Sequence, residues 1–160
     1  MRHHKLERRQ RIPRSPDETF EFFADAMNLE AITPPWLGFH VTTPKPIDME
    51  AGTLIEYRLR LHGLPIRWRT RIEVWQPGRR FVDVQLKGPY RLWHHTHTFE
   101  SDGDGTLMRD LVRYALPLGP LGAAARLLVR HDLDRIFDFR RDEVARCLGA
   151  IEPLVLHKVK

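Results

Sequence analysis

The segment from Tyr90 to Glu100 holds the side chains of this sequence that are most able to do chemistry, because it carries three histidines within four positions. Side chains alternate across a β-strand with a period of two, so a strand here places on one face Trp93, His95, His97 and Phe99. Aromatic side chains at both ends of that face favour burial over contact with water. Enclosed imidazoles act as ligand contacts, acid–base groups or metal ligands, or they are hydrogen-bonded members of a core.

Two segments nearer the N-terminus alternate in the same way and supply further walls for an enclosed space. Their apolar faces consist of Ile55, Tyr57, Leu59 and Leu61 in the first segment, and of Ile66, Trp68, Thr70, Ile72 and Val74 in the second. Several positions between them carry arginines, from Arg58 to Arg71. We expect these arginines to form the solvated face of a sheet, where they also discourage aggregation between sheet edges.

The segment 80–87 has two possible orientations, and the choice decides which acid meets the histidines. Hydrophobicity alone turns Val82, Val84 and Leu86 inward. A short connection through Gly88-Pro89-Tyr90 instead pairs Lys87 with Arg91, which places Asp83 opposite His95 and Gln85 opposite Trp93. In the last alternating segment the favoured inner face consists of Met108, Asp110, Val112, Tyr114 and Leu116.

Three interpretations of these inward polar residues stay open. They form a closed hydrogen-bonded network, they line a pocket that binds a small molecule unchanged, or they catalyse a reaction. In the third case an acid-oriented histidine removes a proton next to a carbonyl, and the product is an aldol cyclisation or a dehydration. The catalytic residues would then be His95, His97, Asp110 and Tyr114.

The same histidine pair also has the spacing of some metal ligands. His95 and His97 share a face, and the third ligand would have to be Asp83 or Asp110. Two histidines at this spacing are not sufficient to indicate a metal site. We therefore predict neither a metal ion nor any other cofactor.

Hydrophobic periodicity and turn residues predict an α+β fold. A first strand at 5–12 is followed by Ser15-Pro16-Asp17-Glu18, which offers an N-cap serine, a proline at the first helical position and two acids. A second short helix is predicted at 28–32. Turns rich in glycine and proline then separate strands at 39–43, 52–62, 65–76, 80–87, 91–101 and 106–116. A long helix from about 121 to 148 is able to cross the whole sheet.

The 160 residues favour one domain over 1–160, with a core at 5–148 and a tail at 149–160. The single cysteine, Cys147, is expected to be buried, and the N-terminal residues lack the apolar run of a signal peptide, so we expect a cytoplasmic protein. No segment has the roughly 20 consecutive apolar residues of a membrane span. The net charge is +5, but the arginines alternate along strands, so we do not expect nucleic-acid binding.

The sequence resembles the START, pollen-allergen and polyketide-cyclase superfamily of helix-grip proteins (SRPBCC) over residues 5–148. The resemblance rests on the order of the elements and on short sequence motifs. These motifs are Thr33-Pro34-Pro35-Trp36-Leu37, Gly52-Thr53-Leu54-Ile55, Tyr57-Arg58-Leu59, Gly88-Pro89-Tyr90 and Trp93-His94-His95-Thr96-His97. It implies a curved antiparallel sheet of about seven strands around a long C-terminal helix, with a cavity between them. It also implies an epimerase-like protein as a possible partner, since relatives of the bacterial cyclase/dehydrase subgroup occur beside such proteins.

We therefore expect a helix-grip protein, monomeric or weakly dimeric, that binds a small hydrophobic or amphipathic molecule without inserting into a membrane. A cyclase or dehydratase and an accessory module of an epimerase-like oxidoreductase are the alternatives. Trp36 lies in an apolar loop that would close the mouth of the cavity. The predicted ligand-binding residues are Trp36, Tyr57, Trp68, Asp83, Gln85, Trp93, His95, His97, Phe99, Asp110, Tyr114 and Ile136.

Overall fold

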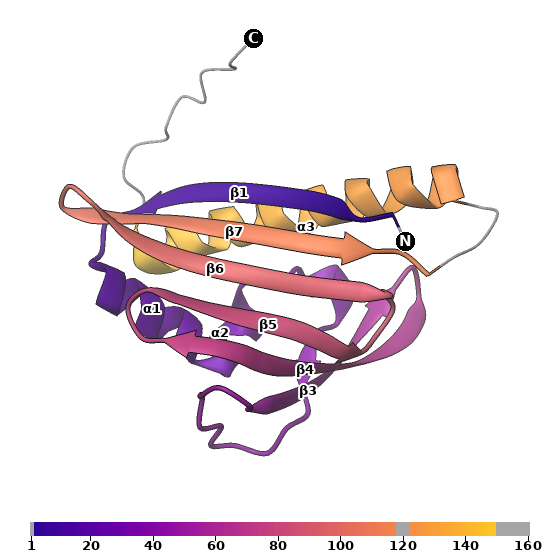
Figure 1. The fold of residues 1–160 in the computed structure, drawn as a ribbon, viewed down its shortest axis with the longest axis horizontal. Coiled ribbons are helices and arrows are strands. Elements are labelled where there is room, and N and C mark those ends of the chain that lie inside the picture. The colour runs from indigo at the N-terminus through magenta and orange to yellow at the C-terminus, as the bar shows by residue number, and fades with distance from the viewer. Residues whose placement is uncertain (1, 118–121, 150–160) are drawn as a thin grey trace, which may run out of the picture.

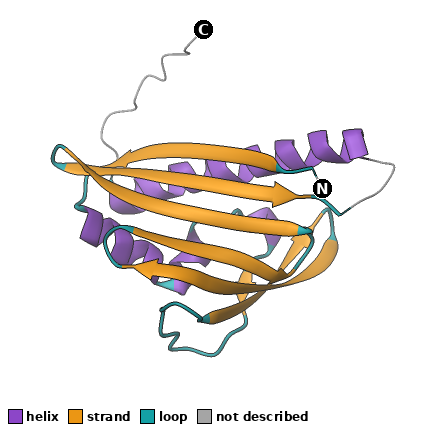
Figure 2. Ribbon diagram, in the orientation of Figure 1, coloured by secondary structure: helices purple, strands orange, loops and turns teal. Residues whose placement is uncertain are grey.

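Alternating side chains organise most of the chain into one antiparallel sheet with the strand order β1-β7-β6-β5-β4-β3-β2. The computed structural model describes residues 2–117 and 122–149. The strands are β1 (His4–Ile12), β2 (His40–Val41), β3 (Leu54–Leu61), β4 (Leu64–Gln76), β5 (Arg80–Lys87), β6 (Leu92–Asp102) and β7 (Gly105–Ala115). The helices all lie on one side of this sheet (Figures 1 and 2). The predicted α+β helix-grip fold is confirmed.

Two short helices follow β1, and each begins at a side-chain cap. Helix α1 (Pro16–Ala24) starts with a capping box in which the Glu18 N–H donates to Ser15 Oγ and the Ser15 N–H donates to Glu18 Oε2. Helix α2 (Ala26–Ala31) starts where Asp25 Oδ1 accepts a hydrogen bond from the Met27 N–H. The Asp25 cap explains why α2 begins two residues before the predicted start at Asn28.

Helix α3 (Gly122–Leu148) packs lengthwise against the sheet (Figure 1). Its buried stripe consists of Leu133, Phe137 and Val144, which have the spacing of one helix face. Cys147, in the last turn of α3, is exposed, so the prediction that it is buried was wrong. Within the described ranges, no helix combines the length and the apolar composition that crossing a membrane requires. The predicted helix start at Leu121 and residues 150–160 of the predicted tail lie outside the described residues.

The register of three neighbouring strands brings the polar residues together. Strand β5 pairs with β6 so that Asp83 lies opposite His95, as the short β5–β6 connection predicted. Strand β6 pairs with β7 so that His97 lies opposite Asp110. Opposite residues of an antiparallel pair point to the same face, and therefore both acids and both histidines share the face that α3 covers.

A β-bulge in β4 changes which residue enters the core. Ile72 pairs with Asp83 and Val74 pairs with Val82, which leaves Glu73 as an extra residue between them. Trp75 consequently pairs with Phe81 and packs in the core against it and against Phe20. The prediction that Val74 points inward was wrong, because alternation is interrupted at the bulge.

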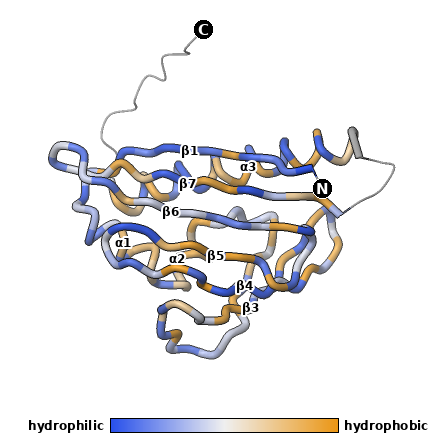
Figure 3. Tube along the Cα trace, viewed as in Figure 1, coloured by the Kyte–Doolittle hydropathy of each residue, from blue (hydrophilic) through white to orange (hydrophobic). Residues whose placement is uncertain are grey.

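The two edge strands differ in length and polarity. Strand β2 has two residues where the sequence predicted five at 39–43. Strand β1 is long, and Figure 3 shows that most of it is hydrophilic. Its Glu7 pairs with Lys5, Arg9 and Arg109. Charged side chains and short length both oppose the addition of another strand at an exposed sheet edge.

Phe20 is the aromatic residue through which α1 is anchored to the sheet. It is 3% exposed, and its ring lies 4.9 Å from Trp75, 5.3 Å from Phe99 and 5.8 Å from Phe81. We expect Phe20→Ala to lower the free energy of unfolding by about 3–5 kcal/mol, because it leaves a cavity among these rings. Urea unfolding followed by circular dichroism measures the change.

The matched control for this prediction is Leu64→Ala, since Leu64 is 66% exposed. We expect the control to change the free energy of unfolding by less than about 0.5 kcal/mol. Equal effects of the two substitutions would contradict the placement of Phe20 in the core.

Candidate functional site

A cavity lies between the inner face of the sheet and the helices that cover it. The sheet contributes residues of β3, β4, β5 and β6, and the covering layer contributes α1, α2, α3 and the 3₁₀ helix η1 (Pro35–Leu37). Most of the lining is apolar or aromatic. Apart from the indoles of Trp68 and Trp93, its polar side chains are those of Asn28, Thr33, Tyr57, Thr70, Asp83, Tyr90, His95, His97 and Arg140.

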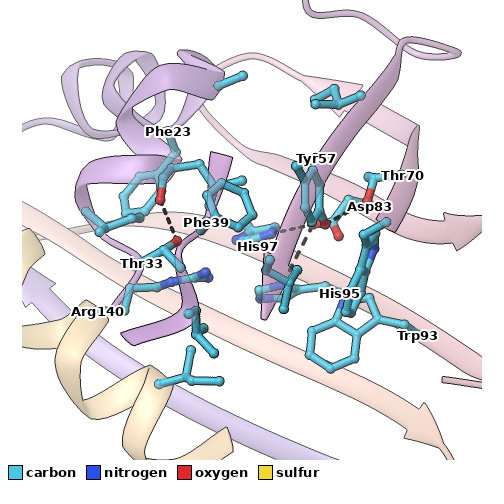
Figure 4. A pocket seen from close by; sticks show the side chains of 18 of the residues that line it. Phe23, Thr33, Phe39, Tyr57, Thr70, Asp83, Trp93, His95, His97 and Arg140 are labelled. Atoms are coloured by element: carbon cyan, nitrogen blue, oxygen red, sulfur yellow. Dashed lines mark hydrogen bonds and ion pairs between the residues drawn. The ribbon is translucent and has the colours of Figure 1, made fainter. Parts of the chain in front are cut away.

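The polar centre of the cavity wall is a group of two histidines and two aspartates, which we call the His–Asp cluster: Asp83, His95, His97 and Asp110. His97 Nε2 lies 2.8 Å from Asp83 Oδ2, and His95 Nε2 lies 2.9 Å from Asp110 Oδ1. His97 Nδ1 approaches the same Asp110 oxygen at 2.9 Å without hydrogen-bonding geometry. His95 Nδ1 lies 3.8 Å from Asp83 Oδ2. Figure 4 shows Asp83, His95 and His97 turned toward one another.

Burial and mutual contacts set the charges of this cluster. His95 and His97 are 4% and 5% exposed. Burial lowers the pKa of His95, and the charge of His97 lowers it further. Burial opposes the charged form of His97 too, but contacts with Asp110 and Asp83 outweigh burial and raise its pKa. For both aspartates, contacts with the histidines overcome burial and lower the pKa. The cluster therefore holds two carboxylates, a neutral His95 and a His97 that favours its protonated form.

Aromatic rings hold both imidazoles in place. The His97 ring stacks on Phe81 with centroids 4.0 Å apart, and the His95 ring meets Trp93 edge to face at 6.2 Å. Trp93 in turn contacts Trp68, whose indole stacks on Tyr57. Packing on several sides restricts ring rotation, so the two imidazoles present fixed nitrogen atoms.

Seven of the residues that the sequence predicted to bind the ligand line this cavity. They are Tyr57, Trp68, Asp83, Trp93, His95, His97 and Ile136. Tyr57 donates to or accepts from Thr70 Oγ1 at 3.0 Å, and burial raises the pKa of Tyr57 well above its usual value. Ile136 reaches the cavity from α3. His94 points to the other face of β6, where its Nε2 lies 3.5 Å from Glu73.

Three of the predicted residues lie on the inner face of the sheet but are covered by other elements. Asp110 contacts His95 and His97, and it lines a neighbouring hollow with Phe137 and Arg140 rather than this cavity. Phe99 is covered by Phe20 and Phe23 of α1. Tyr114 packs in a separate core cluster with Leu133. Strand alternation predicts the face of each residue correctly, but it does not predict which helix covers which part of that face.

Gln85 and Trp36 also lie outside the lining. Gln85 is used in the β5–β6 turn, where its Nε2 donates to the Tyr90 carbonyl at 2.6 Å and its Oε1 accepts from the Tyr90 N–H. Trp36 belongs to η1 and is 49% exposed. Its ring packs against Phe139, and the Arg135 guanidinium lies 4.7 Å above it. Its neighbour Leu37 lines the cavity instead.

Arg140 is the main residue of the lining that the sequence analysis did not single out. It reaches the cavity from α3, and its guanidinium lies 5.0 Å from the centroid of the Phe137 ring (Figure 4). The signal is present in the sequence, because Leu133, Phe137, Arg140 and Val144 repeat every three or four residues. A search for apolar residues alone passes over an arginine in such a stripe.

Comparison with protein families gives one match that covers most of the chain. The family described as "Polyketide cyclase / dehydrase and lipid transport" matches residues 3–147. No curated protein matches the chain.

Solved structures share the fold at low sequence identity. The Zhui aromatase/cyclase from Streptomyces sp. R1128 has a TM-score of 0.73 and 14% identity, with 92% of this chain and 94% of that chain covered. Protein CV1439 from Chromobacterium violaceum has a TM-score of 0.71 and 12% identity, with 92% and 98% covered. Ara h 8.0201 has a TM-score of 0.63 and 14% identity, with 91% and 99% covered. Similarity at this level establishes the fold alone.

The geometry predicts the tautomer of His95. The hydrogen bond to Asp110 requires a proton on Nε2, and the lowered pKa leaves Nδ1 without one at neutral pH. Long-range ¹H–¹⁵N NMR spectra distinguish protonated from unprotonated ring nitrogens. We expect a protonated Nε2 and an unprotonated Nδ1 for His95, assigned by the loss of its signals in His95→Gln.

His94 is the control for this measurement, because it lies on the other face of the same strand and is more exposed. Its replacement in His94→Gln is expected to leave the His95 signals in place. An Nδ1–H tautomer of His95 in the wild-type protein would contradict the arrangement described above.

Proposed function

Because the chain belongs to the polyketide cyclase/dehydrase and lipid transport family, we propose that it binds a small hydrophobic or amphipathic organic molecule in the cavity between the sheet and α3. The observation that carries the proposal is the composition of the cavity wall. Aromatic and aliphatic side chains form most of it, and a few polar groups converge at one place. Small-molecule sites typically combine these two features.

The aromatic part of the wall favours a flat or unsaturated ligand. Tyr57, Trp68, Tyr90 and Trp93 form a connected set of rings, with centroid distances between contacting pairs of 4.8–5.8 Å. Rings of a bound molecule gain from contact with such a surface, because offset and edge-to-face arrangements are favourable beyond simple burial. An aromatic or polyketide-like molecule suits this wall.

The polar part of the wall favours a ligand that also has hydrogen-bond acceptors. Trp68 Nε1 and Arg140 Nε are both buried donors that find no acceptor among the described residues. Buried donors that stay unpaired are costly. A ligand oxygen placed near either group would remove that cost, which supports an amphipathic molecule over a pure hydrocarbon.

Filling the cavity from α3 tests this proposal. We expect the wild-type protein to bind the amphipathic dye 1-anilinonaphthalene-8-sulfonate in a saturable manner with one site per chain, measured by its fluorescence. Ile136→Trp places a larger side chain in the lining, and we expect it to weaken binding by about tenfold or more, which corresponds to about 1.4 kcal/mol. Leu61→Trp fills the cavity from the opposite wall and is expected to have the same effect.

Leu128→Trp provides the matched control, because Leu128 lies on the same helix and is 49% exposed. We expect it to bind the dye as the wild type does, with circular dichroism showing that all three variants are folded. Equal binding by the wild type and both cavity variants would contradict the proposal.

Native mass spectrometry separates binding from conversion. A polyketide-like molecule recovered unchanged from the protein supports a binding function. Recovery of a product lighter by one water would favour the cyclase or dehydratase alternative. Failure of the wild type to bind any such molecule would contradict the binding function and leave the accessory-module alternative.

A further inference from the structure

Three potential metal-binding atoms converge at the wall of the cavity. They belong to Asp83, His95 and His97, each of which offers one ligand atom, and these atoms lie within 4.8 Å of one another. The Asp83 Oδ2 atom is 2.8 Å from His97 Nε2 and 3.8 Å from His95 Nδ1. Ligands of a transition metal with bonds of about 2.0–2.2 Å lie roughly 3.0–3.5 Å apart, and the two separations bracket that range.

One ring nitrogen of His95 has a lone pair available for a metal ion. His95 uses its Nε2–H to bind Asp110, so its Nδ1 carries a lone pair. This nitrogen lies 3.8 Å from Asp83 Oδ2, which is too far for a hydrogen bond. A cation placed between the two atoms could be bound by both.

The cluster combines the two side-chain types that bind transition metals. Asp83 Oδ2 lies 2.8 Å from His97 Nε2, and Asp110 Oδ1 lies 2.9 Å from His95 Nε2. Arg140 lines the same cavity and lowers the pKa of Asp83 through its charge, but it forms no ion pair with either carboxylate in the part of the chain that the structure describes. Neutral imidazoles and ionised carboxylates are the forms in which these side chains bind metal ions.

Asp110 lies beside both imidazoles on the side away from Asp83. Its Oδ1 atom accepts a hydrogen bond from His95 Nε2 at 2.9 Å. It lies at the same distance from His97 Nδ1, without hydrogen-bonding geometry. Metal-binding histidines commonly donate their second nitrogen to a carboxylate, which fixes the tautomer and the ring orientation.

We propose that Asp83, His95 and His97 bind a divalent transition-metal ion, with Asp110 orienting both imidazoles. Two imidazole nitrogens and one carboxylate oxygen suit Zn²⁺, Fe²⁺ or Co²⁺, whereas Mg²⁺ and Ca²⁺ prefer all-oxygen sites. Three protein ligands leave at least one coordination position for a ligand in the cavity. The proposal does not rest on the identity of the organic ligand.

Titration with Co²⁺ and Zn²⁺ tests the site. The protein is first treated with a chelator and dialysed, and metal binding is then followed by the visible absorption of Co²⁺ and by calorimetry with Zn²⁺. We expect one ion per chain at this site. His95→Gln, His97→Gln and Asp83→Asn should each weaken binding by about 100-fold or more through loss of a ligand, and Asp110→Asn by about 10- to 100-fold.

Two controls identify the binding atoms. His94→Gln removes the neighbouring imidazole on the other face of β6 and should bind Co²⁺ as the wild type does. A double variant, His3→Gln with His4→Gln, removes the adjacent histidines near the N-terminus and should likewise retain the site. Loss of the ion in the double variant, with Asp83→Asn and His95→Gln unaffected, would overturn the proposal.

NMR of the wild-type protein keeps the test independent of how well the variants fold. We expect Zn²⁺ to shift the ¹⁵N resonances of His95 Nδ1 and His97 Nε2 selectively. Shifts confined to other histidines would overturn the proposal. So would the absence of any stoichiometric binding by the wild type, and neither result depends on whether the cavity binds an organic molecule.

Discussion

The pairing of buried charges within the His–Asp cluster is the interaction on which the centre of this molecule depends. Four ionisable side chains from β5, β6 and β7 are removed from water, and each is acceptable there only because the others are present. Loss of one partner leaves an uncompensated group in a low-dielectric region, which costs more than the pair gains. The cluster therefore requires that three strands keep their register relative to one another.

That register is fixed on both sides of the cluster by apolar packing. Phe81 and Phe99 hold one end of the inner face against α1, and Val112 and Tyr114 hold the other end against α3. A slip of one residue in β6 would turn both histidines outward and bring His94 and Thr96 inward. The core and the polar cluster thus specify the same pairing, and agreement between two kinds of interaction favours a single folded arrangement.

The sequence predicted the structure correctly where residues close together in the chain determine it. Of the two orientations left open for residues 80–87, the structure has the one that the short connection after β5 favours, with Asp83 opposite His95. The described pairing ends at Val84 and His94, before the expected pairs of Gln85 with Trp93 and of Lys87 with Arg91. Ser15 predicts the start of α1, because its side chain caps the first turn of the helix that follows it. The sequence pattern failed where distant elements decide the outcome. Trp75 enters the core because a bulge at Glu73 interrupts alternation.

The residues of the cavity lining also differ in how far the sequence predicts them. The inner faces of β3, β4 and β6 follow from alternation, and Tyr57, Trp68 and His95 are found where the pattern places them. Whether an inward residue reaches the cavity depends on the covering helices, which is why Phe99 and Tyr114 are packed away from it. Arg140 lies in the lining because its position on α3 places it on the same helix face as Leu133 and Phe137. A prediction from hydrophobicity alone misses it, since its side chain is charged.

The spacing of the two histidines constrains what the cavity can hold. Their rings are 3.7 Å apart, so repulsion between two imidazolium ions opposes protonation of both. With at most one proton on the pair, the two aspartates keep the sheet side of the wall negative. Arg140 brings a positive charge from α3 into the same lining, and this charge lowers the pKa of Asp83. The charged groups of the wall are therefore coupled to one another. An amphipathic molecule and a metal ion make different demands on this wall: the aromatic rings suit the first, and the His–Asp cluster would bind the second.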